Sequence, residues 1–313
     1  MLLACYIFLC IVVLVLFSGA YTFVSACVRR KELPWLDEKA IKKTAYGKYY
    51  ENIVIGDQFL RENHSQEIQI KSYDGLILRG VWVPADDPKG TILLAHGYRS
   101  SKMVDFSLAF EMYHSLGMNI LIPDQRAHGK SEGKYITFGI KESRDMEQWI
   151  AFHNENFCKI PLILSGLSMG ASTVLYLADK DLPDNVKGII ADCGFTSPKE
   201  IIRSVFQNVT HLPAAPTLWV TNLFTRCFAG FGLNDKDTRD VLKNCKVPVL
   251  LVHGVEDGFV PCEMTKQAYT ACSGQKELLL VEKADHGVSF LVEKERYVNT
   301  VIAFLEKHVG GIR

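Results

Sequence analysis

Hydrophobic and polar residues follow three different patterns along the chain. Residues 2–28 carry no charged side chain, and most of them are apolar. Residues 29–64 are polar with scattered aromatic side chains, and from residue 65 short apolar runs alternate with helical patterns. Because hydrophobic periodicity is the main local signal of structure, we expect an apolar anchor (1–28), a helical connector (29–64) and one large domain (65–313).

The N-terminal apolar segment is long enough to cross a bilayer as a helix, which takes about 20 residues. We therefore expect a single-pass membrane anchor. A cleaved signal peptide is an alternative, although no basic residue precedes the run and the run is longer than a usual signal core. Another alternative is a lipoprotein-type signal at Val24–Cys27, which would place a lipid on Cys27. Arg29, Arg30 and Lys31 follow directly and favour a cytoplasmic catalytic domain.

The large domain begins with a predicted hairpin and continues as a parallel sheet. Residues 67–70 and 76–83 alternate with a period of two around a tight turn at Asp74-Gly75. Continuous apolar runs, typical of strands buried on both faces, occupy 91–95, 119–122, 161–164, 187–191, 248–252 and 278–281. Helical patterns occupy 104–117, 141–155, 169–180, 263–272 and 288–308. This alternation predicts a mostly parallel sheet of about eight strands with helices on both faces.

Residues 195–246 interrupt the alternation of strands and helices. A structureless loop of that length is uncommon inside a compact domain, so we expect a small helical cap. Its apolar residues would either line a substrate pocket or form the core of the cap itself. They are Phe195, Phe206, Leu212, Trp219, Phe224, Phe228 and Phe231.

Composition excludes some classes of partner. The chain has 35 basic and 35 acidic side chains, so its balanced charge gives no electrostatic reason to expect nucleic acid. None of the cysteines has the spacing of metal ligands, and we expect neither metal nor cofactor. The six cysteines beyond the apolar segment are expected to be small buried hydrophobic residues. Oligomeric state is not predicted.

One motif points to nucleophilic chemistry. The pentapeptide Gly166-Leu167-Ser168-Met169-Gly170 follows the apolar run 161–164 and precedes a helical pattern. In such a strand–turn–helix the turn is too tight for side chains at the flanking positions, which are therefore glycine. The motif predicts that Ser168 is a nucleophile presented at the carboxyl edge of the sheet.

A serine nucleophile needs a base, and the base needs a carboxylate that orients it. Downstream of Ser168, Asp257 lies in the loop after the run 248–252, and His286 lies just after the run 278–281. We predict that Asp257 and His286 complete the triad. Glu256 and Asp285 are adjacent alternatives for the acid.

Acyl transfer also needs hydrogen-bond donors for the oxyanion of the tetrahedral intermediate. We expect the backbone N–H of Met169, directly after the nucleophile, and that of Tyr98 in the loop after the run 91–95. Because both contributions come from the main chain, we expect that the two side chains could vary without ending catalysis.

Taken in order, these motifs resemble a known superfamily. They are His96-Gly97, Asp124–Gly133, the turn at Ser168, Val252–Asp257 and Asp285–Gly287. Over roughly residues 65–310 the chain resembles the α/β-hydrolases, in particular membrane-anchored members grouped with serine aminopeptidase-like and acyltransferase-like bacterial proteins. The resemblance implies an α/β-hydrolase fold and a Ser-His-Asp triad, with a structural role for Asp124–Gly133, but it implies no substrate.

These inferences predict a membrane-anchored serine hydrolase that cleaves small-molecule or lipid carboxylic esters through an acyl-enzyme. A serine aminopeptidase is the first alternative; it would need an acid such as Asp192 or Asp235 to hold the ammonium group of its substrate. A non-catalytic binding protein is the second alternative, which the complete set of triad residues disfavours.

Overall fold

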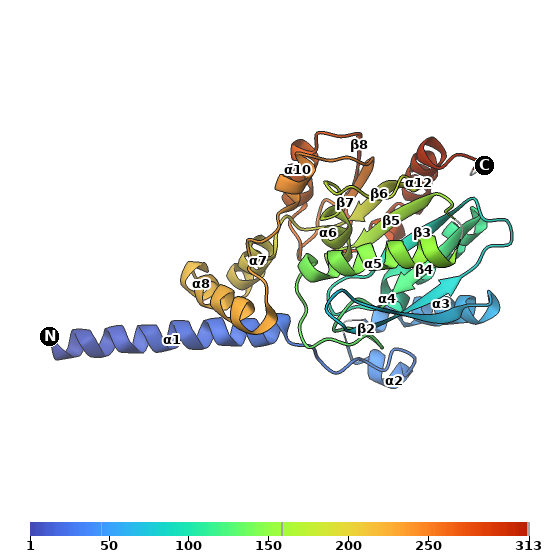
Figure 1. Ribbon diagram of the computed structural model, residues 1–313. Coiled ribbons are helices and arrows are strands. Elements are labelled where there is room, and N and C mark those ends of the chain that lie inside the picture. The colour runs from blue at the N-terminus through green and yellow to red at the C-terminus, as the bar shows by residue number, and fades with distance from the viewer. Residues whose placement is uncertain (45, 158, 312–313) are drawn as a thin grey trace.

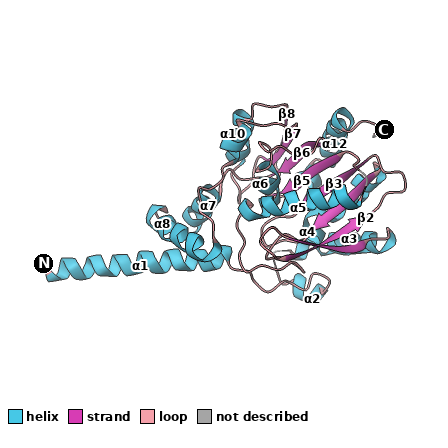
Figure 2. Cartoon of the chain, in the orientation of Figure 1, coloured by secondary structure: helices cyan, strands magenta, loops and turns pink. Residues whose placement is uncertain are grey.

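The computed structural model describes residues 1–44, 46–157 and 159–311. Within these ranges eight strands form one sheet in the order β1-β2-β4-β3-β5-β6-β7-β8 (Figures 1 and 2). The strands are β1 (Gln66–Lys71), β2 (Ile77–Val83), β3 (Gly90–Ala95), β4 (Met118–Pro123), β5 (Leu162–Leu167), β6 (Val186–Asp192), β7 (Val249–Gly254) and β8 (Lys276–Val281). Strand β2 pairs antiparallel with β1 and with β4, and the other pairs of neighbouring strands are parallel. The predicted hairpin and the mostly parallel sheet are confirmed.

Helices cover both faces of this sheet (Figure 1). They are α3 (Tyr50–Glu62), α4 (Lys102–Ser115), α5 (Ile140–Asn156), α6 (Met169–Leu175), α10 (Cys262–Ala271), α11 (Ser289–Val292) and α12 (Lys294–His308). Two predicted helices differ from the structure. The helix expected over 169–180 ends at Leu175 and continues as i→i+3 turns. The helix expected over 288–308 is divided at Glu293, whose backbone angles are not helical.

Alternate residues of the buried strands belong to two separate hydrophobic cores. Leu93 points to one face, where it joins Trp149 of α5. Its neighbour Ile92 points to the other face, where it joins Phe110 of α4 and Phe304 of α12. Because successive side chains of a strand point to opposite faces, a continuously apolar strand is what a sheet with two covered faces requires.

The polar segment before the sheet is helical, with α2 (Glu38–Ile41), the 3₁₀ turn η1 (Gly47–Tyr49) and α3. Helix α3 packs on α4 at a close crossing, where Gly56 lies against Ser107. A Cβ atom at Gly56 would overlap the side chain of Ser107. The segment therefore adds a helix to one face of the sheet.

The interruption between β6 and β7 consists of α7 (Pro198–Thr210), α8 (Ala215–Phe224), the π-helical turn η2 (Thr225–Ala229) and α9 (Thr238–Leu242). Its aromatic residues have different environments. Phe231 is buried, whereas Trp219 is 71% exposed. Phe224 stacks against Phe23 of the N-terminal helix, with ring centroids 5.9 Å apart. These helices therefore bury part of their apolar surface against the N-terminus of the chain.

The N-terminal helix α1 (Leu2–Cys27) projects from the body, with α8 beside the half that is nearer the domain (Figure 1). Among the described residues it is the one helix long and apolar enough to cross a membrane. Its last turns are part of the folded domain, since Phe23 and Cys27 are buried in the core that faces α5 and α6. The amide of Ile136 donates to the carbonyl of Cys27 (2.7 Å), and Val28 pairs with Tyr135 as a β-bridge.

Two phenylalanines of α1 provide a matched test of this packing. Phe23 is 5% exposed and Phe17 is 69% exposed. We expect Phe23→Ala to lower the free energy of unfolding by about 3 kcal/mol because it leaves a cavity. The control Phe17→Ala should change it by less than about 0.5 kcal/mol. Thermal denaturation of the full chain in detergent micelles measures both, and equal effects would contradict the packing described here.

Candidate active site

The turn between β5 and α6 holds Ser168 in a strained position. Its φ is +56°, in a region that residues other than glycine rarely occupy. A Cβ atom at Gly166 would overlap the backbone of Gly170, and one at Gly170 would overlap the carbonyl of Ala95. Both flanking positions therefore accept only glycine, as the motif predicts.

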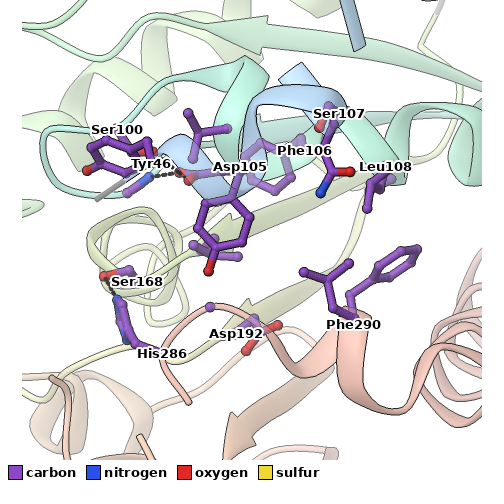
Figure 3. Close-up of a pocket in the computed structure, with 18 of the residues that line it drawn as sticks. Tyr46, Ser100, Asp105, Phe106, Ser107, Leu108, Ser168, Asp192, His286 and Phe290 are labelled. Atoms are coloured by element: carbon purple, nitrogen blue, oxygen red, sulfur yellow. Dashed lines mark hydrogen bonds between the residues drawn. The ribbon is translucent and has the colours of Figure 1, made fainter. Parts of the chain in front are cut away.

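Three side chains that are far apart in the sequence meet at this turn. The Nε2 atom of His286 lies 2.9 Å from Oγ of Ser168 (Figure 3), and its Nδ1 atom lies 2.7 Å from Oδ2 of Asp257. His286 comes from the loop after β8, and Asp257 comes from the loop after β7. The structure thus brings together the three residues that the sequence selected. An imidazole in this position can remove the hydroxyl proton while the carboxylate holds its orientation.

The environment of Asp257 favours its charged form. Burial alone would raise the pKa of this carboxyl, but hydrogen bonds with His253 and His286 outweigh it and hold the pKa well below its ordinary value. The amides of Phe259 and Val260 also donate to its Oδ1 atom, at 2.9 and 2.8 Å. Asp257 is therefore an anion that can stabilise a positive charge on His286.

Neither alternative acid has comparable geometry. Oδ1 of Asp285 accepts the amides of His286 and Gly258, at 2.7 and 3.0 Å, and so stabilises the loop. Glu256 is exposed. Among the acids considered from sequence, Asp257 is the one hydrogen-bonded to the ring of His286.

The loop after β3 lies against the nucleophile. A Cβ atom at Gly97 would be 3.3 Å from Cβ of Ser168, which places the backbone of this loop next to the reacting hydroxyl. Asp105 holds the loop through the amide of Gly97 and the hydroxyl of Ser100, both at 2.6 Å. The amide of Tyr98 follows directly, at the position predicted for an oxyanion donor.

The side chain of Tyr98 has a contact that sequence analysis missed. Its hydroxyl donates to the carbonyl of Ala26 at the end of α1 (2.9 Å). In the next residue, the guanidinium of Arg99 donates to the carbonyl of Val28 (3.1 Å). The side chain of Tyr98 thus joins the active-site loop to the N-terminal helix. No local pattern in the sequence indicates this contact across more than seventy residues.

The segment 124–133 supports the active-site loop through hydrogen bonds. Nε2 of His128 accepts the amide of Arg99 (3.0 Å), and burial lowers the pKa of His128 to about 3, so its imidazole is neutral. The guanidinium of Arg126 donates to Asp145 (2.6 Å) and Asp74 (2.9 Å). These bonds agree with the structural role that the resemblance implies.

A cavity of about 600 Å³ opens beside Ser168, and the carboxyl groups of Asp105, which is half-buried, and Asp192, which is buried, line it (Figure 3). Burial raises the pKa of Asp105 and of Asp192 to about 6. Sequence analysis considered Asp192 as a group that could hold an ammonium ion, but it missed Asp105. Asp105 lies inside a helical pattern, where its spacing resembles that of an ordinary surface residue. Asp235, the other acid considered, is paired with Arg226 and lies outside this cavity.

One group of potential metal ligands occurs among the described residues. Atoms of Cys193, Asp257 and His286 lie within 4.8 Å of one another. Burial raises the pKa of the Cys193 thiol far above its ordinary value, which disfavours the thiolate that a metal binds. The donor set therefore fits proton transfer better than a metal.

The burial predicted for the six cysteines beyond the apolar segment is confirmed for only some of them. Cys193, Cys262 and Cys272 are buried, Cys245 is half-buried and Cys227 is exposed. The prediction is wrong for Cys227, which lies in the outer turn η2. Cys158 lies outside the described residues.

Comparisons with known proteins agree with this geometry. A model of the family described as "Serine aminopeptidase, S33" matches residues 86–229. The uncharacterized protein YqkD of Bacillus subtilis is 29% identical over 238 residues, which cover 76% of this chain and 78% of that protein. Protein bem46 of Schizosaccharomyces pombe is 24% identical over 82% of this chain and 81% of its own length.

Solved structures share the fold. The esterase Pf2001 of Pyrococcus furiosus superposes with a TM-score of 0.65 at 24% identity, covering 80% of this chain and 94% of that one. Together with the eight-stranded sheet and the glycine-flanked turn at Ser168, these likenesses show that the chain has the α/β-hydrolase fold.

The buried carboxyl of Asp192 predicts how stability depends on pH. A folded pKa of about 6 lies above the unfolded value of about 3.9, so the stability that this group contributes is fully present below about pH 4 and is lost as the pH rises through 6. Asn does not ionise. We therefore expect the stability of Asp192→Asn relative to the unsubstituted protein to increase between pH 4 and pH 8, by up to about 3 kcal/mol.

Thermal melts of both proteins across this pH range measure the difference. The exposed residue Asp86 supplies the control Asp86→Asn, whose difference from the unsubstituted protein should stay constant. A constant difference for Asp192→Asn as well would show that burial does not shift this carboxyl.

Proposed function

We propose that this protein is a membrane-anchored serine hydrolase that cleaves carboxylic esters. The observation that carries the proposal is the continuous hydrogen-bonded chain from Ser168 through His286 to Asp257. The fold, shared with structures described as esterases, supports the same chemistry. The full set of triad residues argues against a non-catalytic binding protein.

The proposed reaction has two halves. In the first, Oγ of Ser168 attacks the ester carbonyl carbon while its proton passes to Nε2 of His286. The tetrahedral intermediate then collapses, the ester C–O bond breaks and the imidazolium returns the proton to the departing alcohol. In the second half, water attacks the acyl-enzyme with the same histidine as base, which releases the acid and restores Ser168. Asp257 stabilises the imidazolium in both halves.

The oxyanion in each half is proposed to bind the backbone N–H groups of Tyr98 and Met169. Two observations support this proposal: Met169 directly follows Ser168 in the tight turn, and the loop that Asp105 holds lies next to Ser168 at Gly97. Fixed donors of this kind act where charge develops, so they stabilise the transition state more than the substrate.

The N-terminal helix is proposed to remain attached as the membrane anchor. Removing it as a signal peptide would take Phe23 and Cys27 out of the hydrophobic core. A lipid attached to Cys27 would likewise require this side chain to leave its buried position in the core. Arg30 and Lys31 favour a cytoplasmic domain. Arg29 has a further structural role, because its guanidinium donates to the carbonyls of residues 129 and 131.

A serine aminopeptidase is the second candidate function. The specific observation in its favour is that Asp192 and Asp105 line the cavity beside Ser168, where a carboxylate can hold a substrate ammonium group. However, Asp105 already accepts two hydrogen bonds from the loop after β3. The acidic group that remains is Asp192, one of whose oxygens has no hydrogen-bond partner within the described part of the chain.

Substitutions at the triad test the proposal on the full chain in detergent, with 4-nitrophenyl esters of graded acyl length and amino-acyl 4-nitroanilides side by side. We expect ester hydrolysis, with kcat reduced about 10⁶-fold by Ser168→Ala. Asp257→Asn should reduce it about 10⁴-fold because the histidine loses its correct tautomer. The exposed neighbour of Asp257 supplies the control Glu256→Gln, which should stay within about twofold.

The two candidate functions give different outcomes in this panel. Hydrolysis of the anilides alone, lost in Ser168→Ala, would establish the peptidase instead. An unchanged rate in Ser168→Ala would exclude this residue as the nucleophile in either case.

A further inference from the structure

Two cavities meet at Ser168, and they differ in character. The first has a mixed lining that includes the carboxyl groups of Asp105 and Asp192. The second, of about 360 Å³, has an almost entirely apolar lining surface, although a few hydroxyl-bearing residues, Ser168 among them, border it. Phe259 and Tyr98 border both cavities. An ester carbonyl at Ser168 would therefore have a compartment with carboxyl groups on one side and an apolar compartment on the other.

One wall of the apolar cavity is the N-terminal helix itself. Ser18, Tyr21, Thr22 and Ala26 of α1 line it at successive turns of that helix. The wall is continuous from the exposed part of α1 to the end that is buried in the domain. The segment expected only to anchor the protein thus also borders the site.

Specific contacts fix this wall relative to the domain. The hydroxyls of Ser18 and Thr217 are 3.0 Å apart, and the hydroxyl of Thr221 donates to the carbonyl of Gly19 (3.2 Å). A Cβ atom at Gly19 would overlap the side chain of Val220, so α1 and α8 approach as closely as glycine allows. Small and hydroxyl-bearing residues at such a crossing are typical of helices that pack together in membranes.

Another wall comes from α7. Ile201 and Ile202 are buried, Val205 is half-buried and Val209 is 74% exposed. Phe195 and Phe138, which also line the cavity, are buried. Exposure thus increases along α7, and we take the end of the cavity at Val209 as its outer end and the end at Ser168 as its inner end.

The outer end of this cavity lies where a bilayer would surround α1. The apolar helix has no charged side chain between Leu2 and Val28, and the hydrocarbon layer takes about 20 of its residues. Next to it, Leu212 and Trp219 of the neighbouring segment are largely exposed although they are large and apolar. Tryptophan is enriched at the membrane–water interface. These side chains and the end of the cavity would thus contact lipid rather than water.

We propose that α1 forms one wall of the acyl-binding site and that the substrate is a membrane lipid ester whose acyl chain enters from the bilayer between α1 and α7. This inference rests on the proposed ester hydrolysis at Ser168. The acyl chain occupies the apolar cavity, and the polar alcohol part faces Asp105 and Asp192 in the other one.

Two positions of α1 give a matched pair of variants. Thr22 lines the cavity, whereas Val24 is 56% exposed and does not border it. Thr22→Trp should fill the cavity, and Val24→Trp adds the same side chain outside it. Rates on 4-nitrophenyl acetate and 4-nitrophenyl decanoate are measured with the full chain in detergent micelles. They are expressed per active site labelled by a small fluorophosphonate, so unfolded molecules are not counted.

We expect Thr22→Trp to lower the ratio of decanoate to acetate kcat/KM at least tenfold. Val24→Trp should leave the ratio unchanged. An unchanged ratio in Thr22→Trp, or an equal fall in both variants, would overturn the inference while acetate turnover shows that the hydrolase function stands. Loss of acetate turnover equal to that of decanoate would also overturn it.

A second measurement avoids substitution. An alkyl fluorophosphonate with a ten-carbon chain and a terminal diazirine is attached to Ser168 of the unsubstituted protein and then photolysed. Cross-links to peptides containing residues 18–26 or 201–209 are expected. Cross-links confined to the region of α4 and α12 would place the chain in the cavity that contains Asp105 and Asp192, and would overturn the inference. Absence of any labelling at Ser168 would instead count against the proposed function.

Discussion

The close approach of the turn between β5 and α6 to the end of β3 is the constraint on which the site depends. The backbones at Gly166, Gly170 and Ala95 lie so close that no side chain fits among them. This contact holds Ser168 at a positive φ and directs its hydroxyl out of the turn. Because β7 and β8 run parallel to β5 and end at the same edge, the loops that follow them bring Asp257 and His286 to this hydroxyl.

The N-terminal helix belongs to the fold as well as to the proposed membrane segment. Tyr98 lines the cavity beside Ser168 and its hydroxyl donates to the carbonyl of Ala26, so the active-site loop and the end of α1 are held by the same residue. The packing of α1 against α8 then places one side of α1 along the cavity that reaches Ser168. An anchor that only fixed the location of the enzyme would not need these contacts.

Three aspartates around one histidine show how environment decides the charge of a carboxyl group. Asp257 is buried, but it accepts hydrogen bonds from an imidazole and two backbone amides, and its pKa is low. Asp192 is buried and Asp105 is half-buried, both with fewer such donors, and loss of solvent raises their pKa values to about 6. Partners stabilise the first as an anion, whereas desolvation penalises the charge on the other two.

The sequence by itself determined the strands, their parallel arrangement and the choice of Ser168, Asp257 and His286. These features follow from local signals: continuous apolar runs, glycines that only a tight turn requires, and the position of polar residues just after strands. Only the tertiary structure decided that Asp105 supports the loop, that Tyr98 binds α1, and that α1 and α7 enclose a cavity. Each of these depends on side chains far apart in the chain, and periodicity describes which face a residue occupies but not which distant surface covers that face.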